Sequence, residues 1–231
     1  MIRMFDLTGA DPRRRFSPYC WRTRMALAHK GLAVETIPWR FTDKDAIAFS
    51  GQGRVPVVQD GERALFDSLA IAYDLEARYG DRPSLFGGVG GEALVRFLNN
   101  WADGVLHPAL VRLIIADVWT ILAEQDRSYF RTSREARFGA ALEAVQRDRG
   151  EAVIGFRKLL EPLRATLAAQ PYLGGAAANY ADYIVFGAFQ WARVTSPFPL
   201  LEADDPIVVW RERLLDAFDG LARQVPAASA P

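Results

Sequence analysis

The chain of 231 residues is poor in cysteine and histidine, and both shortages restrict its chemistry. A single cysteine, Cys20, excludes a disulfide within the chain. The two histidines, His29 and His107, have no cysteine or histidine partner at the spacing of a structural zinc site. We therefore expect no metal site and assign a structural role to both histidines. The lack of a disulfide framework favours a reducing, cytoplasmic setting.

Charge of one sign and long hydrophobic runs are also missing. The chain has 28 lysine and arginine residues and 28 aspartate and glutamate residues, so no long-range field attracts nucleic acid or an anionic membrane. Residues 105–123 form the most apolar long stretch, but His107, Pro108, Arg112 and Asp117 interrupt it. The first residues lack the apolar segment of a secretory signal. We expect neither a nucleic-acid partner nor a membrane partner.

The stretch from residue 54 to residue 68 predicts a hairpin that leads into a helix. Residues 55–58 and 64–66 are short apolar runs, and a tight-turn dipeptide, Asp60-Gly61, separates them. Pro56 cannot donate to a sheet ladder, so it belongs at the start of its strand or on an edge. Two interpretations stay open: an ordinary edge-strand proline, or a cis proline whose turn leaves the Val55 N–H and C=O free for an extended peptide.

Asp67 and Ser68 stand where the chain becomes helical, because apolar residues at helical spacing follow them. A carboxylate and a hydroxyl at this place satisfy the free N–H groups of a helix start. The same helix start can hold charged groups of a ligand. Capping and ligand binding both remain possible roles for this pair.

The first 80 residues predict a small α/β domain. Strands are expected at residues 2–7 and 33–38, with a helix at 19–30 between them that Ser17 caps and Pro18 begins. Residues 41–49 predict a weak helix before the hairpin. This βαβ unit followed by ββα should have a right-handed crossover, and its ligand edge should lie where the first helix begins.

The rest of the chain predicts helices only. Glycine and proline are dense in residues 81–91, which we interpret as a linker, and apolar residues recur at helical spacing after it. Residues 183–191 are nearly all apolar, so we expect a helix that is buried on all sides. The predicted organisation is an α/β domain at 1–80, a linker at 81–91 and an all-helical domain at 92–231, ending in a frayed tail from residue 225.

Four segments in this order resemble the glutathione transferase family. They are Ser17-Pro18-Tyr19-Cys20, Arg54-Val55-Pro56-Val57, Asp67-Ser68 and Asn179-Tyr180-Ala181-Asp182-Tyr183. Further segments resemble the bacterial branch of this family that contains the β-aryl etherases. They are the continuation Trp21-Arg22-Thr23-Arg24, Trp101, and the segments around Asp204-Asp205-Pro206 and Phe218-Asp219-Gly220.

The resemblance implies a thioredoxin-like domain that binds glutathione and a helical bundle that supplies the acceptor pocket. It implies that the Val55 backbone pairs with the cysteinyl part of glutathione and that a cis Pro56 shapes the turn. Asp67 and Ser68 would then hold the γ-glutamyl end, and Gln52 would lie near the glycyl end. The family also implies a homodimer.

Ser17 is the expected catalytic residue. A thiol becomes a good nucleophile as a thiolate, which a helix N-terminus and a hydroxyl donor both favour. Ser17 would therefore lower the pKa of the glutathione thiol rather than attack a substrate itself, and it can cap the helix at the same time. Relatives that act through their own thiol have a cysteine at this position, so serine favours transferase or lyase chemistry over disulfide reduction. Tyr19 is an alternative donor, and Cys20 is expected to be a buried core residue.

Aromatic residues of the helical half are candidates for the acceptor pocket, although each can equally be a core residue. They are Trp119, Tyr129, Phe130 and Trp191. The arginines at 13–15, 22 and 24 can attract glutathione carboxylates or form a solvated face.

Three functions follow as hypotheses. In the first, an activated glutathione thiolate attacks a small hydrophobic aromatic electrophile. One such electrophile is a β-aryl ether, which would lose a phenolate. In the second, the protein conjugates glutathione to small electrophiles in general. In the third, it binds aromatic ligands without catalysis.

Overall fold

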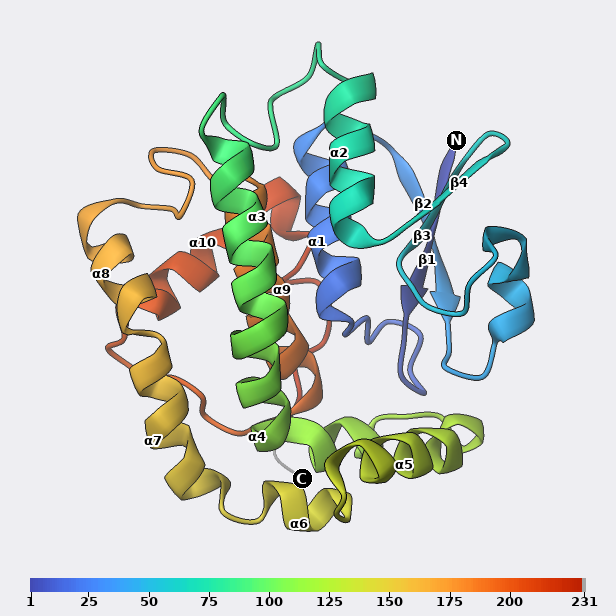
Figure 1. Ribbon diagram of the computed structural model, residues 1–231, viewed down its shortest axis with the longest axis vertical. Coiled ribbons are helices and arrows are strands. Elements are labelled where there is room, and N and C mark those ends of the chain that lie inside the picture. Colours follow the sequence, from blue (N-terminus) through green and yellow to red (C-terminus); the bar gives the residue numbers. More distant parts are fainter. Residues whose placement is uncertain (230–231) are drawn as a thin grey trace.

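The computed structural model describes residues 1–229, and its N-terminal part is built on one four-stranded sheet (Figure 1). The strands are β1 (Ile2–Leu7), β2 (Val34–Trp39), β3 (Val57–Asp60) and β4 (Arg63–Phe66), in the order β2-β1-β3-β4. β1 is parallel to β2 and antiparallel to β3, so Phe5 pairs with Ile37 on one side and with Val57 on the other. The predicted thioredoxin-like domain is confirmed.

Helix α1 (Pro18–His29) joins the two parallel strands and lies between the sheet and the helical domain (Figure 1). It is buried on both sides, which is why Cys20, Trp21 and Met25 are all inaccessible to solvent. A 3₁₀ helix, η1 (Lys44–Ser50), takes the place of the expected weak helix, and it ends at Gly51 with a positive φ of 72°. Helix α2 (Ser68–Arg78) follows the hairpin.

The remaining described residues form a helical domain, as predicted. Its elements are α3 (Gly91–Trp101), a π-helical turn η2 (Ala102–Leu106), α4 (His107–Thr120), α5 (Glu124–Phe138), α6 (Leu142–Gln146), α7 (Arg149–Leu159), α8 (Glu161–Ala169), α9 (Tyr180–Thr195) and α10 (Pro206–Gly220). α3, η2 and α4 run on without a loop, while non-helical dihedrals at 217–219 kink α10 near its end.

Helix α9 is the buried helix that the apolar run predicts. A capping box begins it: the Asn179 side chain accepts from the Ala181 N–H, and Asp182 Oδ2 accepts from the Asn179 N–H. α9 packs closely on the start of α1 because Gly187 has no side chain. A Cβ at this position would lie 2.4 Å from the Pro18 carbonyl oxygen. The contact fixes the helix start that carries Ser17.

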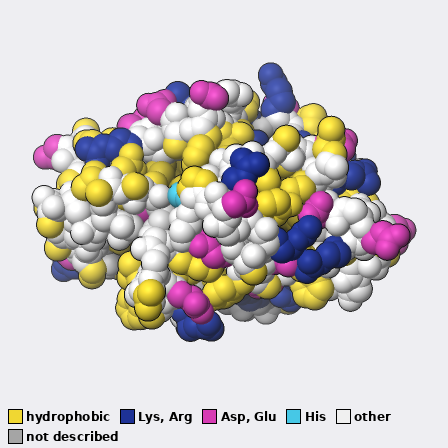
Figure 2. Space-filling model, turned by 90° about the horizontal axis from the view of Figure 1, so that it is seen from above, with side chains coloured by type: hydrophobic (Ala, Val, Ile, Leu, Met, Phe, Trp, Pro, Cys, Tyr) yellow, Lys and Arg dark blue, Asp and Glu magenta, His cyan; other side chains and the backbone are white. Residues whose placement is uncertain are grey.

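The surface and the chain end complete the fold. Figure 2 shows basic and acidic side chains interspersed over the visible face, as the balanced composition suggests. Within residues 1–229, no helix combines the length and the apolarity that crossing a membrane requires.

The predicted fraying is wrong for the start of the tail, since Val225 is buried and the Ala228 N–H donates to the Arg193 carbonyl at 2.8 Å. Residues 230 and 231 of the predicted tail and helical domain lie outside the described residues.

Candidate functional site

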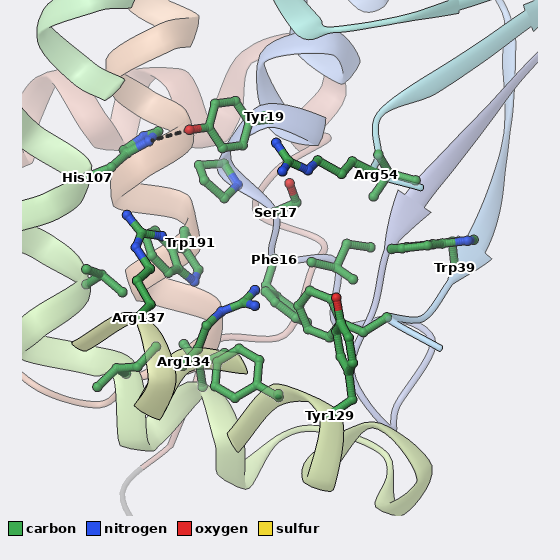
Figure 3. Close-up of a pocket in the computed structure, with 18 of the residues that line it drawn as sticks. Phe16, Ser17, Tyr19, Trp39, Arg54, His107, Tyr129, Arg134, Arg137 and Trp191 are labelled. Atoms are coloured by element: carbon green, nitrogen blue, oxygen red, sulfur yellow. Dashed lines mark hydrogen bonds between the residues drawn. The ribbon is translucent and has the colours of Figure 1, made fainter. Parts of the chain in front are cut away.

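Two adjoining cavities open where the sheet domain meets the helical domain. The hairpin cavity, of about 510 Å³, is lined by Tyr19, Gln52, Gly53, Arg54, Val55, Pro56, Phe66, Asp67, Ser68 and Asp103. The aromatic cavity, of about 450 Å³, lies between α1, η1, α4, α5 and α9, and its side chains are drawn in Figure 3. Their linings share Tyr19, Gly53, Arg54, Val55 and Asp103. A ligand in one cavity can therefore reach the other.

The hairpin cavity brings together all five residues for which the resemblance implies glutathione contacts. The Val55–Pro56 peptide bond is cis, and Pro56 is buried just before β3 begins. Within residues 1–229, the Val55 N–H and C=O have no hydrogen-bond partner. Free main-chain N–H and C=O groups of this kind, just before a strand begins, can pair with the backbone of an extended peptide.

Asp67 and Ser68 close the other end of the hairpin cavity. Asp67 has a positive φ of 68°, and its Oδ1 accepts from the N–H groups of Leu69 and Ala70 at 3.0 and 2.9 Å. Its second oxygen and the Ser68 hydroxyl have no hydrogen-bond partner in the described part of the chain. The pair therefore caps α2 and still presents an acceptor and a donor to a ligand, so both predicted roles are available.

The side-chain amide of Gln52 forms its hydrogen bonds within its own loop. Its Nε2 donates to the Ser50 hydroxyl and to the Arg54 carbonyl, and its Oε1 accepts from the Arg54 N–H. The side chain lines the hairpin cavity as predicted, but its amide holds the loop that carries Arg54. Arg54, which sequence reasoning placed in the key stretch but not among the site residues, is the exposed cation at this end.

Ser17 caps α1 at the wall of the aromatic cavity (Figure 3). Its Oγ accepts from the Cys20 N–H at 3.2 Å, and within residues 1–229 the hydroxyl has no acceptor for its own proton. The Tyr19 N–H of the same first turn is likewise unpaired there. A hydroxyl proton and a free N–H at a helix start together form a site that stabilises an anion.

Tyr19 belongs to a second polar group that crosses between the domains. Its hydroxyl lies 3.4 Å from His107 Nδ1 on α4, and the Arg22 guanidinium lies 4.6 Å from its ring centroid. Arg22 is itself fully buried and donates to Asn99 and to Asp103 on η2. Burial and then Asp103 raise the pKa of the Tyr19 phenol. The Tyr19 hydroxyl is thus engaged with His107, whereas the Ser17 hydroxyl lies at the N-terminus of α1.

His107 is a neutral imidazole at physiological pH, because burial and the nearby Arg22 lower its pKa to about 3. The Asp103 carboxylate lies 3.6 Å away but pairs with Arg22 at 2.8 Å. The unfolded chain should protonate His107 below pH 6.5, whereas the folded chain does so only near pH 3. Folding is therefore favoured by His107 above pH 6.5, and this stabilisation is lost as the pH falls from 6.5 towards 3.

We expect His107→Gln to flatten the acid dependence of stability. Urea unfolding at pH 7 and pH 5 should show that the wild type loses about 2 kcal/mol more than the variant over this interval. His29→Gln is the comparison variant at a half-buried histidine outside both cavities, whose Nδ1 lies 2.7 Å from the Tyr183 hydroxyl. Burial lowers the pKa of His29 as well, so this variant should flatten the acid dependence in the same direction but by less. Equal losses in wild type and His107→Gln would contradict the burial argument.

The aromatic cavity contains three of the four predicted acceptor residues, namely Tyr129, Phe130 and Trp191. Trp119 lies outside it. The neighbouring residue Val118 lines the cavity, and successive helical side chains point about 100° apart, so Trp119 faces α5 instead. There it packs between the guanidinium groups of Arg127 and Arg131, at 5.0 and 4.7 Å from its ring.

Sequence reasoning missed several lining residues of the aromatic cavity: Phe16, Trp39, Phe41, Lys44, Asp103, His107, Arg134 and Arg137. They come from the loop before α1, from β2 and the loop after it, and from η1, η2, α4 and α5. No spacing along the chain links them, because only the packing of the two domains brings them together. Arg54 is the exception, since it directly precedes Val55 and could have been found.

Cys20 and most arginines of the N-terminal segment serve the fold. Burial raises the pKa of the Cys20 thiol, and the side chain is inaccessible, so it is no nucleophile. Arg13 pairs with Asp11, and Arg15 and Arg24 face the buried Asp6 at 4.0 and 3.5 Å. The exposed Arg13 fits the solvated-face interpretation, whereas Arg15 and Arg24 fit neither interpretation, because they lie against a buried carboxylate of β1.

Two family profiles match this chain. The one described as "Glutathione S-transferase, N-terminal domain" matches residues 13–83, and the one described as "Glutathione S-transferase, C-terminal domain" matches residues 93–199. Together they cover well over half of the chain, and residues 84–92, most of which belong to the segment that we interpret as a linker, lie between them. They contain every residue of the hairpin cavity and every residue of the aromatic cavity except Leu7.

Individual relatives agree with the profiles. Glutathione S-transferase 4 of Zea mays is 26% identical over 206 residues, which is 86% of this chain and 83% of the relative. A glutathione S-transferase of Ceriporiopsis subvermispora, solved in complex with glutathione, superposes with a TM-score of 0.82 at 23% identity over 99% of both chains. A glutathione transferase of Phanerochaete chrysosporium gives a TM-score of 0.81 at 24% identity, over 99% of this chain and 98% of its own.

Proposed function

Because the chain belongs to the glutathione S-transferase family, we propose that it transfers glutathione to a small hydrophobic electrophile held in the aromatic cavity. The sulfur atom of the glutathione thiol would be the atom that attacks the electrophile. The observation that carries this proposal is the junction of the two cavities, where the Ser17 hydroxyl, which accepts from the Cys20 N–H and keeps its own proton free, lies at the start of α1 between the free Val55 backbone and an apolar space.

The residues of the hairpin cavity fit a tripeptide with a charged end. The free Val55 N–H and C=O suit its cysteinyl backbone, and Asp67 with Ser68 suits the ammonium and carboxylate of its γ-glutamyl end. Arg54 suits the glycyl carboxylate at the same end of the cavity as Gln52. We assign Gln52 to holding this loop, because both N–H groups of its amide are already donated within the loop.

Ser17 would act as a hydrogen-bond donor to the sulfur. The transfer forms a carbon–sulfur bond and breaks the bond to the leaving group, whose electron pair departs with it. The role of Ser17 is to keep the sulfur ionised before attack, which a charge-assisted hydrogen bond does by about 1.5–3 kcal/mol. Tyr19 remains the alternative donor, although its hydroxyl is directed to His107.

We further propose an aryl ether as electrophile, with a phenolate as the leaving group. Six aromatic residues line the space, namely Phe16, Trp39, Phe41, Tyr129, Phe130 and Trp191. Aromatic walls bind aromatic ligands by stacking and edge contacts, each worth about 0.5–1.5 kcal/mol beyond area burial. This lining supports the β-aryl etherase function that the resemblance implies.

Incubation with glutathione and a β-aryl ether ketone should release the phenol and the glutathione thioether in equal amounts. Chromatography with mass detection would measure both products. A chlorinated nitrobenzene is the matched test for general conjugation. Thioether formation from that compound without any ether cleavage would replace the etherase proposal with the general one. Saturable binding of aromatic ligands without turnover of either compound would replace both with a non-catalytic role.

We also propose that the protein is a homodimer, as the family resemblance implies. Apolar side chains are left exposed on one segment of the helical domain, with Leu94 and Phe97 on α3 at 40% and 65% exposure. Such side chains are suited to a protein interface. Light scattering after size exclusion would show twice the mass of the 25.7 kDa chain, and a single-chain mass would contradict this proposal.

A further inference from the structure

The aromatic cavity carries an excess of positive charge that the net charge of the chain does not suggest. Four cationic side chains line it, namely Lys44, Arg54, Arg134 and Arg137, against a single carboxylate, Asp103. Asp103 is engaged by Arg22 at 2.8 Å, and the imidazole of His107 is neutral. Figure 3 shows the guanidinium groups of Arg134, Arg137 and Arg54 around the same space.

None of these four cations has a carboxylate within ion-pair distance in the described part of the chain, although most other arginines there do. Lys44 Nζ donates to the Gly53 carbonyl, and Arg134 donates to the Ser133 hydroxyl, so both contacts are neutral. Burial, followed by the charges of Arg134 and Arg54, lowers the pKa of Lys44. Burial likewise lowers the pKa of Arg134. The buried Asp126 carboxylate acts on Lys44 from beyond ion-pair distance, so the cations of this cluster repel each other and none of them is paired with an anion.

We propose that the acceptor substrate of the aromatic cavity is an anion, an aromatic ring that carries a carboxylate or a group of the same charge, with Arg134 and Lys44 as its charge-recognising residues. This inference rests on the proposed transferase function and narrows its substrate class.

Arg134 is built into the aromatic wall. Its guanidinium lies 4.8 Å from the Phe130 ring centroid and 5.4 Å from that of Phe41. Lys44 Nζ lies 4.9 Å from the Trp39 centroid and 5.6 Å from that of Tyr129. Each cation is therefore held against two aromatic rings on the side of the cavity formed by η1 and α5. An aromatic ring with a negative substituent matches this combination, because the same wall offers stacking surface and a charged donor.

The carboxylates of glutathione do not account for these two cations. Arg54 lines both cavities and suits the glycyl end, but Lys44, Arg134 and Arg137 line the aromatic cavity alone. They belong to the space that is left for the second substrate.

The test has a binding arm that needs no catalysis. Calorimetry with 4-phenoxybenzoate and its neutral partner 4-phenoxybenzamide compares two ligands that differ in charge and little in shape. We expect the carboxylate to bind about tenfold more tightly, as one charge-assisted hydrogen bond predicts. Arg134→Gln and Lys44→Gln should each remove most of this preference. Arg127→Gln on the same helix, outside both cavities and paired with Glu124, should leave it unchanged.

The turnover arm uses a phenacyl aryl ether that bears either a para carboxylate or a para carboxamide on the phenol ring. A higher kcat/KM for the carboxylate, reduced by Arg134→Gln mainly through KM, supports the inference. Equal affinity for the two ligands in the binding arm would overturn it, as would a preference that survives both cavity variants while their melting temperatures show intact folding. A carboxylate preference in binding with no turnover of either ether would refute the transferase proposal and leave the anion site in place.

Discussion

Ser17→Ala is expected to lower kcat/KM with any electrophile by roughly 10²-fold, the effect of losing one hydrogen bond to a charged group. The hydroxyl lies at the start of α1 and has no acceptor for its own proton among the described residues. Its loss should raise the pKa of the bound thiol by about one to two units, since each unit corresponds to about 1.4 kcal/mol. Thiolate absorbance near 240 nm, recorded against pH with glutathione bound, measures this shift directly.

Two controls separate the donor role of Ser17 from its capping role. Ser17→Thr keeps the hydroxyl and should retain most activity, whereas Ser17→Ala also removes the cap on the Cys20 N–H, at a cost of about 1 kcal/mol in stability. Tyr19→Phe tests the alternative donor. If Tyr19→Phe abolishes the thiolate signal and Ser17→Ala leaves it intact, the assignment of Ser17 is wrong and Tyr19 takes its place.

Asp182→Ala is expected to reduce the free energy of unfolding by about 3–5 kcal/mol, the range for breaking a buried charged network. Asp182 is inaccessible to solvent at the start of α9. Its Oδ1 accepts from the Leu173 N–H at 2.7 Å and from the Trp210 indole at 2.8 Å, and its Oδ2 accepts from the N–H groups of Gly174 and Asn179, both at 3.0 Å. Removal of the carboxylate leaves four donors without a partner, and three of them belong to the buried residues Leu173, Asn179 and Trp210.

Asp182→Asn keeps the volume but replaces one accepting oxygen by a donor, so it should be nearly as destabilising. Asp216→Asn is the matched surface control, because that carboxylate is 65% exposed in a pair with Arg223, and it should change stability by less than about 0.5 kcal/mol. Urea unfolding followed by tryptophan fluorescence measures all three variants. A loss for Asp182→Ala as small as that of Asp216→Asn would show that the capping network does not stabilise the helical core.

The sequence by itself determined the features that depend on neighbouring residues. The Asp60-Gly61 turn, the cap at Ser17 and the cap at Asp67 follow from local backbone and hydrogen-bonding chemistry, so the hairpin and the starts of α1 and α2 could be placed without a structure. The five residues for which the resemblance implies glutathione contacts lie within one short segment, residues 52–68, and they line one cavity. The cis state of Pro56 was left open, because local sequence allows both isomers.

Only the tertiary structure determined which residues line the aromatic cavity. Its walls come from elements that are far apart in the chain, and a helix turns by about 100° per residue, so which of two adjacent residues faces the cavity depends on how the helix is packed. Val118 lines it while Trp119 does not, although both belong to the same apolar stretch. The grouping of Lys44 and Arg134 likewise arises because η1 and α5 meet, and no local pattern records that meeting.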